Sequence, residues 1–253
     1  MHQLFSSSIE ITDYAIGDVH GCVAQLKAAL EWCASDALQN GTRGRVHLLG
    51  DYVDRGPNSK EVIDLLIDGP QDEHMEWHPL KGNHDDMFSS VWYAPSHEMA
   101  SAWWEHGGQQ TLTSYGWNPL YHPIPDHISE WVPEEHAAFL KALPLTAETD
   151  THIYVHAGLR PELTLEQQNE RDLMWIRSEF SRSSYDFGKV VVYGHTPDSK
   201  NPRDHGNRIA MDSGCFATGI LSIVAVDDCG RRLRFKEIEA DLVIENGSSL
   251  SPV

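Results

Sequence analysis

One arrangement recurs five times in this chain: a short apolar run followed directly by a turn that contains glycine and at least one Asp, His or Asn. The turns are GDVHG at 17–21, GDYVDRG at 50–56, GNH at 82–84, HAG at 156–158 and GH at 194–195. Glycine allows backbone conformations that a side chain forbids, and it lets a loop approach an ion or a phosphate closely. One Asp–His pair alone carries little information, but five such turns together indicate a binding site.

The apolar runs predict strands, and the segments after the first three turns predict helices. Apolar residues recur at helical spacing from 23 to 33 and from 62 to 67, and Ser59 is expected to cap the second of these helices. The expected strands are 14–16, 45–49, 77–80, 153–155, 190–193, 208–211, 220–226 and 233–239. This order indicates an α/β fold whose C-terminal half has α+β character and is antiparallel. Since ligands bind at the carboxyl ends of strands in such sheets, the turns are expected to line one site.

The segment from about 86 to 151 is organised differently. It is rich in proline and contains Trp92, Trp103, Trp104, Trp117 and Trp131. We expect residues 1–253 to form a single domain in which this segment is a helical and loop insertion beside the site, as a lid or a wall. The alternative is that the tryptophans fill the core under long loops, because large aromatic side chains are usually buried.

Composition limits the class of partner. Net charge is −19, with 38 acidic against 19 basic residues, and so acidic a surface repels a nucleic acid polymer. A small phosphorylated substrate stays compatible, because bound metal ions reverse the field inside a site. We find no apolar run of membrane-spanning length, no secretory signal in residues 1–12 and no CxxC pair among four cysteines. We therefore expect a cytoplasmic monomer without a membrane partner.

Carboxylate, amide and imidazole side chains in the turns suggest two divalent metal ions about 3.5–4 Å apart. Asp51 is the best candidate to bridge them, because a carboxylate can serve two ions and Asp51 lies on the central early turn. Such mixed ligands favour Mn²⁺, with Fe or Zn²⁺ as alternatives, over Ca²⁺. A site of this kind makes a bridging hydroxide available near neutral pH, and that hydroxide would attack phosphorus directly.

In this order the turns resemble the phosphoprotein phosphatase family, the serine/threonine phosphatases of the calcineurin-like metallophosphoesterase superfamily, and in particular its short bacterial members. The matching residues span 17–196, and Asp212 to Cys215 extend the similarity to about 215. The resemblance implies a four-layer sandwich of two mixed β-sheets flanked by helices. Two residues depart from the family pattern: Asp85 replaces the usual Glu of the protein phosphatases, and Ser213 replaces the usual Thr.

The resemblance also implies a role for each site residue. The first metal ion would be bound by Asp18, His20 and Asp51, and the second by Asp51, Asn83, His156 and His195. His84 would protonate the leaving oxygen, and Asp54 would orient the His84 imidazole. Arg55 would hold phosphate oxygens with its planar guanidinium, and Arg177 resembles the second phosphate-binding arginine of the family.

Three functions follow from these residues. The leading one is hydrolysis of phosphate monoesters, above all phosphoserine and phosphothreonine in proteins, with phosphotyrosine as a further substrate. The alternative is a symmetrical dinucleoside polyphosphate hydrolase acting on diadenosine tetraphosphate, with tryptophans of the insertion stacking on adenine. Many such hydrolases are altered at the position of Asp54, although some bacterial relatives keep the aspartate. A non-catalytic phosphopeptide-binding protein is the remote third, because all six ligand positions are retained. The expected partner is thus a phosphoprotein or a phosphorylated small molecule.

Overall fold

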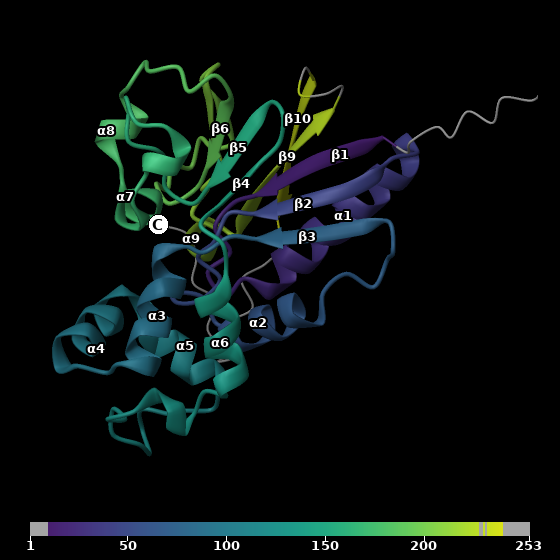
Figure 1. Cartoon of the computed structure of the whole chain (residues 1–253). Helices are drawn as coiled ribbons and strands as arrows, with labels where there is room; N and C mark the ends of the chain where they lie inside the picture. The colour runs from purple at the N-terminus through teal and green to yellow at the C-terminus, as the bar shows by residue number, and fades with distance from the viewer. Residues whose placement is uncertain (1–9, 228–229, 231, 240–253) are drawn as a thin grey trace, which may run out of the picture.

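The computed structural model describes residues 10–227, 230 and 232–239, and two five-stranded sheets form its centre (Figure 1). Cys229 and residues 1–9 of the N-terminal segment considered above lie outside this part. The first sheet consists, in spatial order, of β10 (Arg232–Glu239), β9 (Ile220–Asp227), β1 (Ile11–Ile16), β2 (Arg43–Leu48) and β3 (Met75–Pro79). The second consists of β4 (Thr146–Glu148), β5 (His152–Val155), β6 (Val190–Tyr193), β8 (Arg208–Ala210) and β7 (Arg203–Asp204). The expected strands are thereby confirmed.

Alternating side chains place the two sheets against each other. In β1, Tyr14 and Ile16 face the helices while Ala15 faces the second sheet, as the two-residue period of a strand requires. In β5, Tyr154 points to the first sheet in the same way. A buried apolar layer between the sheets results, and the predicted arrangement of two mixed sheets flanked by helices is confirmed.

The second sheet differs from the expectation that the C-terminal half is antiparallel. Strands β5, β6 and β8 are parallel to one another, and antiparallel pairing occurs at the edge strands β4 and β7. The prediction is right for β9 and β10, which are antiparallel, and wrong for the centre of the second sheet. The parallel strands are short, continuous apolar runs buried on both faces, which is typical of a parallel sheet covered by helices.

Helices cover the outer faces of both sheets. The α-helices are α1 (Val23–Asn40), α2 (Ser59–Asp68), α3 (Asn83–Tyr93), α4 (His97–Trp103), α5 (Gln109–Ser114), α6 (Glu134–Ala142), α7 (Glu170–Trp175), α8 (Ser178–Ser181) and α9 (Cys215–Thr218). Shorter turns are η1 (Trp104–Gly108), η2 (Ile128–Glu130) and η3 (Leu165–Gln167). Helices α1 and α2 pack on the first sheet, and α7 and α8 on the second. No helix in the described part of the chain is both long and apolar enough to cross a bilayer.

Helix α2 begins differently from the sequence expectation. Asn58 is its N-cap and Ser59 is its first residue, without a side-chain cap. The Ser59 hydroxyl instead lies 3.2 Å from the backbone nitrogen of Asp54 and 3.2 Å from the Thr111 hydroxyl. The N-cap role predicted for Ser59 is therefore wrong, because its hydroxyl is hydrogen-bonded to the backbone of Asp54 in the GDYVDRG turn.

The insertion forms a cluster of helices, α3 to α6, at one end of the two sheets (Figure 1). Trp103 and Trp117 are buried in the same apolar cluster as α1, α2 and the first sheet. Trp92, Trp104 and Trp131 pack against that cluster from the outside. The tryptophans thus fill the core, as the alternative expectation had it, but Trp103 also borders the residues described next.

Candidate metal centre and catalytic residues

The GDVHG, GDYVDRG, GNH, HAG and GH turns meet at the carboxyl ends of β1, β2, β3, β5 and β6. All six predicted metal ligands come together there, and none is more than 5% exposed: Asp18, His20, Asp51, Asn83, His156 and His195. Turns from both sheets contribute, so the cluster exists only when the two sheets are packed.

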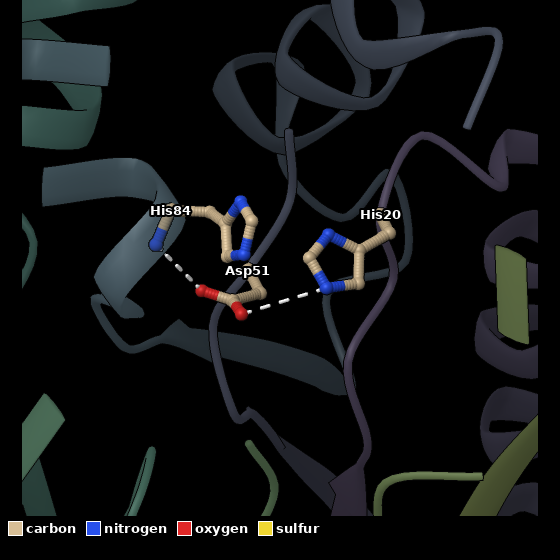
Figure 2. A group of neighbouring side chains, drawn as sticks. All are labelled: His20, Asp51 and His84. Atoms are coloured by element: carbon tan, nitrogen blue, oxygen red, sulfur yellow. Dashed lines mark hydrogen bonds and ion pairs between the residues drawn. The ribbon is translucent and has the colours of Figure 1, made fainter. Parts of the chain in front are cut away.

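Asp51 lies at the centre of this cluster. Its Oδ1 accepts the backbone N–H of His84 at 2.9 Å, and its Oδ2 lies 3.5 Å from Nε2 of His20 (Figure 2). Nε2 of His156 lies at the same distance, 3.5 Å, from Oδ2 on the other side. Asp51 belongs to two groups whose ligand atoms all lie within 4.8 Å of one another: His20–Asp51–His84 and Asp51–His156–His195. Each group could hold a metal ion, and Asp51 is the residue they share.

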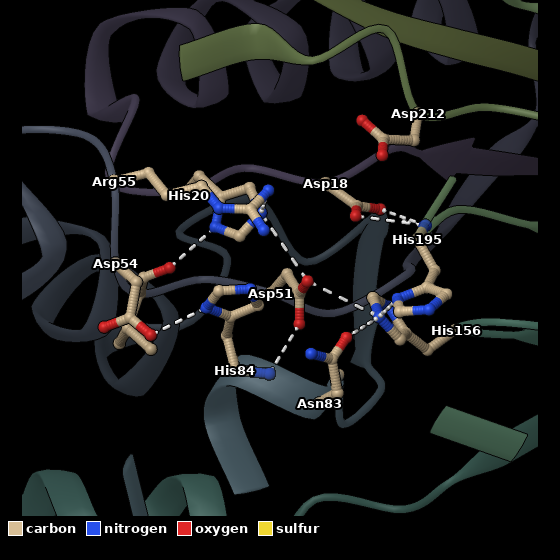
Figure 3. A network of polar contacts seen from close by, with 12 residues as sticks. Asp18, His20, Asp51, Asp54, Arg55, Asn83, His84, His156, His195 and Asp212 are labelled. Atoms are coloured by element: carbon tan, nitrogen blue, oxygen red, sulfur yellow. Dashed lines mark hydrogen bonds and ion pairs between the residues drawn. The ribbon is translucent and has the colours of Figure 1, made fainter. Parts of the chain in front are cut away.

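The ring nitrogens show which atoms are available to a metal ion. Nδ1 of His20 and of His156 each lie 2.8 Å from a backbone carbonyl, which only accepts, so each Nδ1 carries the proton and the lone pair of each ring is on Nε2. Nε2 of His156 faces Oδ1 of Asn83 at 2.9 Å and Nδ1 of His195 at 3.2 Å (Figure 3). Nε2 of His195 is buried and has no hydrogen-bond partner among the residues that the structure describes. Oxygen and imidazole lone pairs directed at one another fit a divalent cation.

The electrostatics of the cluster agree with that fit. Burial lowers the pKa of His20 to about 3, and burial with the neighbouring His156 lowers the pKa of His195 to about 2. Both rings are therefore neutral near pH 7, as metal ligands must be. Burial, Asp212 and Asp51 raise the pKa of Asp18 well above its usual value. A cation would relieve this crowding of buried carboxylates.

Asp18 lies at the edge of the cluster. Its two carboxylate oxygens accept the backbone N–H of His195 at 3.1 and 3.0 Å, and Figure 3 shows it between His195 and Asp212. Neither of the two three-residue groups includes Asp18. The structure therefore brings Asp18 to the site with its carboxylate turned toward the His195 loop.

Unusual backbone conformations concentrate at the site. His20, Asp51, Asp54, Arg55 and His195 all have positive φ, between 43° and 70°, which is uncommon for residues other than glycine. Such conformations persist only where the surroundings hold them. These turns therefore adopt unfavourable backbone conformations that direct their side chains into the site.

Asp85 holds two of these turns together. Its carboxylate accepts the backbone N–H groups of Asp51 at 2.8 Å, Tyr52 at 2.9 Å and Gly82 at 2.9 Å. The aspartate that departs from the protein phosphatase pattern thus ties the GDYVDRG turn to the GNH turn. A buried carboxylate with three N–H donors is a strong local constraint.

His84 and Asp54 form a buried pair next to the metal ligands. Nδ1 of His84 lies 2.7 Å from Oδ2 of Asp54. Burial lowers the pKa of His84, but Asp51 and the hydrogen-bonded Asp54 outweigh burial and leave this pKa above its usual value. His84 is therefore the one imidazole of the cluster that favours its charged form.

The two predicted arginines differ in position. Arg55 is half-buried, with Nη1 3.1 Å from Nε2 of His20 and its guanidinium carbon 5.0 Å from the centre of the Phe216 ring. Arg177 is exposed at the rim, where its charge contributes to lowering the pKa of His156 and His195. Both cations can reach an anionic substrate from different sides.

Two cavities border this region and differ in character. One, of about 750 Å³, is lined by Arg160, Arg171, Trp175 and Arg177 and lies at the rim of the site. Another, of about 490 Å³, lies within the insertion behind Trp103, and none of the ten predicted site residues lines it. Of the ten predicted site residues, Arg177 alone lines the first cavity, which adjoins the ligand cluster through Trp175, whose ring centre lies 6.1 Å from that of His195.

Sequence reasoning missed several residues that contact the site, among them Ser59, Trp103 and Thr111. Trp103 and Thr111 both hydrogen-bond to Asp54, which precedes them by 49 and 57 residues. No local motif marks either position. Their contacts depend on how the insertion folds back over the GDYVDRG turn.

Comparisons with known proteins show the family of the chain and its fold. Asymmetrical bis(5'-nucleosyl)-tetraphosphatase PrpE of Geobacillus sp. (strain WCH70) is 25% identical over 229 residues, covering 82% of this chain and 87% of the relative. A candidate diadenosine tetraphosphatase of known structure is 20% identical with a TM-score of 0.60, over 90% of this chain and 97% of that one. A Saccharomyces cerevisiae protein serine/threonine phosphatase with similarity to human PP5 is 15% identical with a TM-score of 0.55, over 93% and 82%. Residues 14–226 match the calcineurin-like phosphoesterases, and the chain belongs to that family.

Proposed function

We propose that this chain hydrolyses phosphate esters with two divalent metal ions, one held by Asp18, His20 and Asp51 and the other by Asp51, Asn83, His156 and His195. When bound, such a pair of ions neutralises charge on the phosphoryl oxygens and lowers the pKa of the attacking water. The sharing of Asp51 by two ligand groups supports its role as the bridge. Mn²⁺ is the proposed metal, with Fe or Zn²⁺ as the alternatives, because the ligands mix oxygen and imidazole.

His84 is the proposed general acid, and Asp54 is the proposed partner that keeps its ring charged and oriented. An alkoxide is a strong base and leaves phosphorus readily only when it is protonated. The buried 2.7 Å contact between His84 and Asp54 is the single observation on which the choice of preferred substrate rests. It favours phosphate monoesters of alcohols, and so phosphoserine and phosphothreonine in proteins, with phosphotyrosine as a further substrate.

The two arginines are proposed to bind the substrate. Arg55 would hold the reacting phosphoryl group, because it lies next to His20 within the site. Arg177 would hold the same group or an adjacent anionic group from the rim. A planar guanidinium binds phosphate oxygens in pairs and so fixes their orientation.

A dinucleoside tetraphosphate is the second candidate substrate. The name of the Geobacillus relative favours it, and so does a feature of the site rim. Trp175 is 37% exposed, its ring centre lies 6.1 Å from that of His195, and it shares a cavity with Arg160, Arg171 and Arg177. An exposed indole beside cations suits a nucleobase and its phosphates. Tryptophans of the insertion suit this role less well than expected, because Trp103 and Trp117 are buried.

A direct competition between substrates tests the choice. The protein is stripped of metal, reloaded with Mn²⁺, and assayed with phosphoserine peptides and with diadenosine tetraphosphate. Preference for the peptides supports the monoester proposal, and preference for the dinucleotide overturns it. Unequal nucleotide products would indicate asymmetrical cleavage, and two equal products the symmetrical cleavage expected from the sequence. Metal binding without turnover of either substrate would favour a phosphopeptide-binding protein.

One variant sharpens this comparison. Trp175→Ala removes the exposed indole and leaves the proposed metal ligands in place. If the dinucleotide is the substrate, this variant raises its KM while hydrolysis of phosphopeptides changes little. Trp104→Ala in the insertion serves as the control, because Trp104 packs on Trp117, with ring centres 5.3 Å apart, away from the rim cavity.

We further propose that residues 1–253 are one domain with residues 86–151 as its insertion. The shared apolar cluster of Trp103, Trp117, α1 and the first sheet supports this organisation. A single cooperative unfolding transition, followed by tryptophan fluorescence and by circular dichroism, is the expected result.

A further inference from the structure

The insertion supplies two hydrogen-bond donors to the carboxylate of Asp54. Nε1 of Trp103 lies 2.9 Å from Oδ1 and 3.1 Å from Oδ2 of Asp54. The Thr111 hydroxyl donates to Oδ1 at 2.7 Å. Asp54 and Thr111 are 0% exposed and Trp103 is 1% exposed, so water cannot replace these donors.

The geometry leaves the carboxylate one orientation. Oδ2 faces Nδ1 of His84 at 2.7 Å, while Oδ1 is occupied by Thr111 and the indole N–H of Trp103 spans both oxygens. Rotation of the carboxylate would leave buried charge or buried donors unpaired, which is costly. Asp54 is therefore held in the position that its contact with His84 needs.

Thr111 also holds the backbone of Asp54. The backbone N–H of Asp54 donates to the Thr111 hydroxyl oxygen at 2.8 Å, while the same hydroxyl donates to the Asp54 side chain. A hydroxyl can accept and donate at once, so one side chain fixes both ends of the aspartate. Asp54 needs this support, because its φ is +70°.

The two donors are themselves fixed by glycines between them. A Cβ on Gly108 would lie 2.4 Å from the Trp103 ring, so only glycine lets the chain pack this closely on the indole. A Cβ on Gly107 would lie 2.6 Å from the backbone nitrogen of Arg55, and the Gly107 carbonyl accepts the Arg55 N–H at 3.3 Å. Residues 103–111 are thus docked directly on Asp54 and Arg55.

We propose that Trp103 and Thr111 are positioning residues that hold Asp54 so that Asp54 orients the imidazole of His84. This role rests on the proposed function of His84 as general acid. The insertion would then contribute to the reaction by positioning the general acid through Asp54, and not by covering the site as a lid.

The test uses two variants: Trp103→Phe removes the indole N–H together with part of the ring, and Thr111→Val removes the hydroxyl and keeps the side-chain volume. Trp103→Phe and Thr111→Val are each expected to lower kcat roughly 10-fold or more on phosphoserine peptides, whose leaving group needs a proton. Hydrolysis of p-nitrophenyl phosphate, whose leaving group does not, is expected to change little. Thr111→Ser keeps the hydroxyl and is expected to restore the peptide activity.

Matched controls come from the same segment. Trp104 packs on Trp117, and the Thr113 hydroxyl donates to the Gln109 carbonyl at 2.9 Å, so neither side chain is bonded to Asp54. Trp104→Phe and Thr113→Val should therefore leave both activities near those of the parent protein. Equal losses in the controls and in Trp103→Phe or Thr111→Val would overturn the proposal.

A double-variant cycle separates positioning from general damage. In the His84→Ala background, adding Trp103→Phe or Thr111→Val is expected to cause no further loss, because the acid they position is gone. Additive losses would overturn the positioning role. A loss in His84→Ala that is equal on both substrates would overturn the acid role itself, whereas a selective loss there without one in Trp103→Phe and Thr111→Val overturns only the positioning role.

A spectroscopic measurement tests the contact without turnover. The indole N–H resonance of Trp103, assigned by its loss in Trp103→Phe, is expected to shift when Asp54→Asn replaces the charged acceptor. The Trp104 indole resonance should stay in place. The spectra are recorded with diamagnetic Zn²⁺, because bound Mn²⁺ would broaden resonances near the site. An unmoved Trp103 resonance in Asp54→Asn, with bound Zn²⁺ unchanged, would show that the hydrogen bond is absent and would overturn the proposal.

Discussion

At the scale of single residues, the site depends on giving chemically equal groups different environments. His20 and His84 are both buried imidazoles beside Asp51, yet burial lowers the pKa of His20 while Asp51 and Asp54 raise that of His84. The first is suited to donate a lone pair and the second to donate a proton. The two rings also differ in the partner of Nδ1, which is a backbone carbonyl for His20 and the Asp54 carboxylate for His84.

The raised pKa of His84 predicts the pH dependence of turnover. A general acid must be protonated, so kcat on phosphoserine peptides should fall as pH rises through the pKa of His84, which lies above 6.5. Asp54→Asn removes the partner that raises this pKa, so the fall should move to lower pH. The measurement is a kcat–pH profile with p-nitrophenyl phosphate as the reference substrate. A basic limb that stays in place in Asp54→Asn would contradict the pairing.

Glycine makes a second residue-scale prediction. A Cβ on Gly194 would lie 2.0 Å from Oδ1 of Asp18, so Gly194→Ala should displace that carboxylate and lower both bound metal and turnover. Gly188→Ala is the matched control: Gly188 has φ +76° with open space around it, so the cost should be backbone strain of about 1–2 kcal/mol without metal loss. Metal content of the two variants, measured by mass spectrometry, decides the matter. Full metal occupancy in Gly194→Ala would contradict the placement of Asp18.

At the scale of elements, the strands and the turns after them are predictable because both signals are local. Short apolar runs predict β1, β2, β3, β5 and β6, and glycine with Asp or His marks where each run ends. Pairing direction in the second sheet is not local, since it depends on α7 and α8 covering its outer face. The contacts of Trp103 and Thr111 with Asp54 could not be predicted from the sequence either, because they also depend on non-local packing.

One polar junction ties three elements together. Asp36 of α1 accepts the Tyr14 hydroxyl of β1 at 2.8 Å and is paired with Arg234 of β10. Asp36→Asn should lower the free energy of unfolding by about 1–3 kcal/mol at pH 7, because the Arg234 guanidinium loses a charged acceptor and one of the two acceptor oxygens is replaced by a donor. Glu148→Gln, at an exposed pair with Lys189, should change it little.

The contribution of Asp36 should depend on pH in a defined direction. Burial raises the pKa of Asp36, but Arg234 and Tyr14 outweigh burial and bring it below 3.8. A carboxylate with a lowered folded pKa stabilises fully above its unfolded pKa and loses that contribution as pH falls through the folded one. The difference between the parent protein and Asp36→Asn, measured by urea unfolding, should therefore shrink below about pH 4. A difference that is the same at pH 7 and pH 3 would contradict the charged pairing.

At the scale of the whole molecule, an acidic chain carries arginines beside its site. Net charge is −19, and Arg160, Arg171 and Arg177 line one cavity together with Asp172 and Glu179, with Arg160 paired to Asp172. Nine of the ten site residues predicted from the sequence lie in the turns that follow β1, β2, β3, β5 and β6, because the carboxyl ends of these strands meet at one edge. Arg177 lies instead between α7 and α8. The sequence alone does not predict how the site is enclosed, because this depends on how the insertion packs on the first sheet.

The central claim is that one carboxylate, Asp51, joins two metal ions into a hydrolytic site. The most direct measurement loads the protein and its Asp51→Asn variant with Mn²⁺ and records bound metal and phosphate release from the same samples. We expect two ions per chain in the parent protein, and loss of metal at both positions together with turnover in Asp51→Asn. Asn83→Ala should lose metal at one position only. Two bound ions and unchanged turnover in Asp51→Asn would contradict the claim.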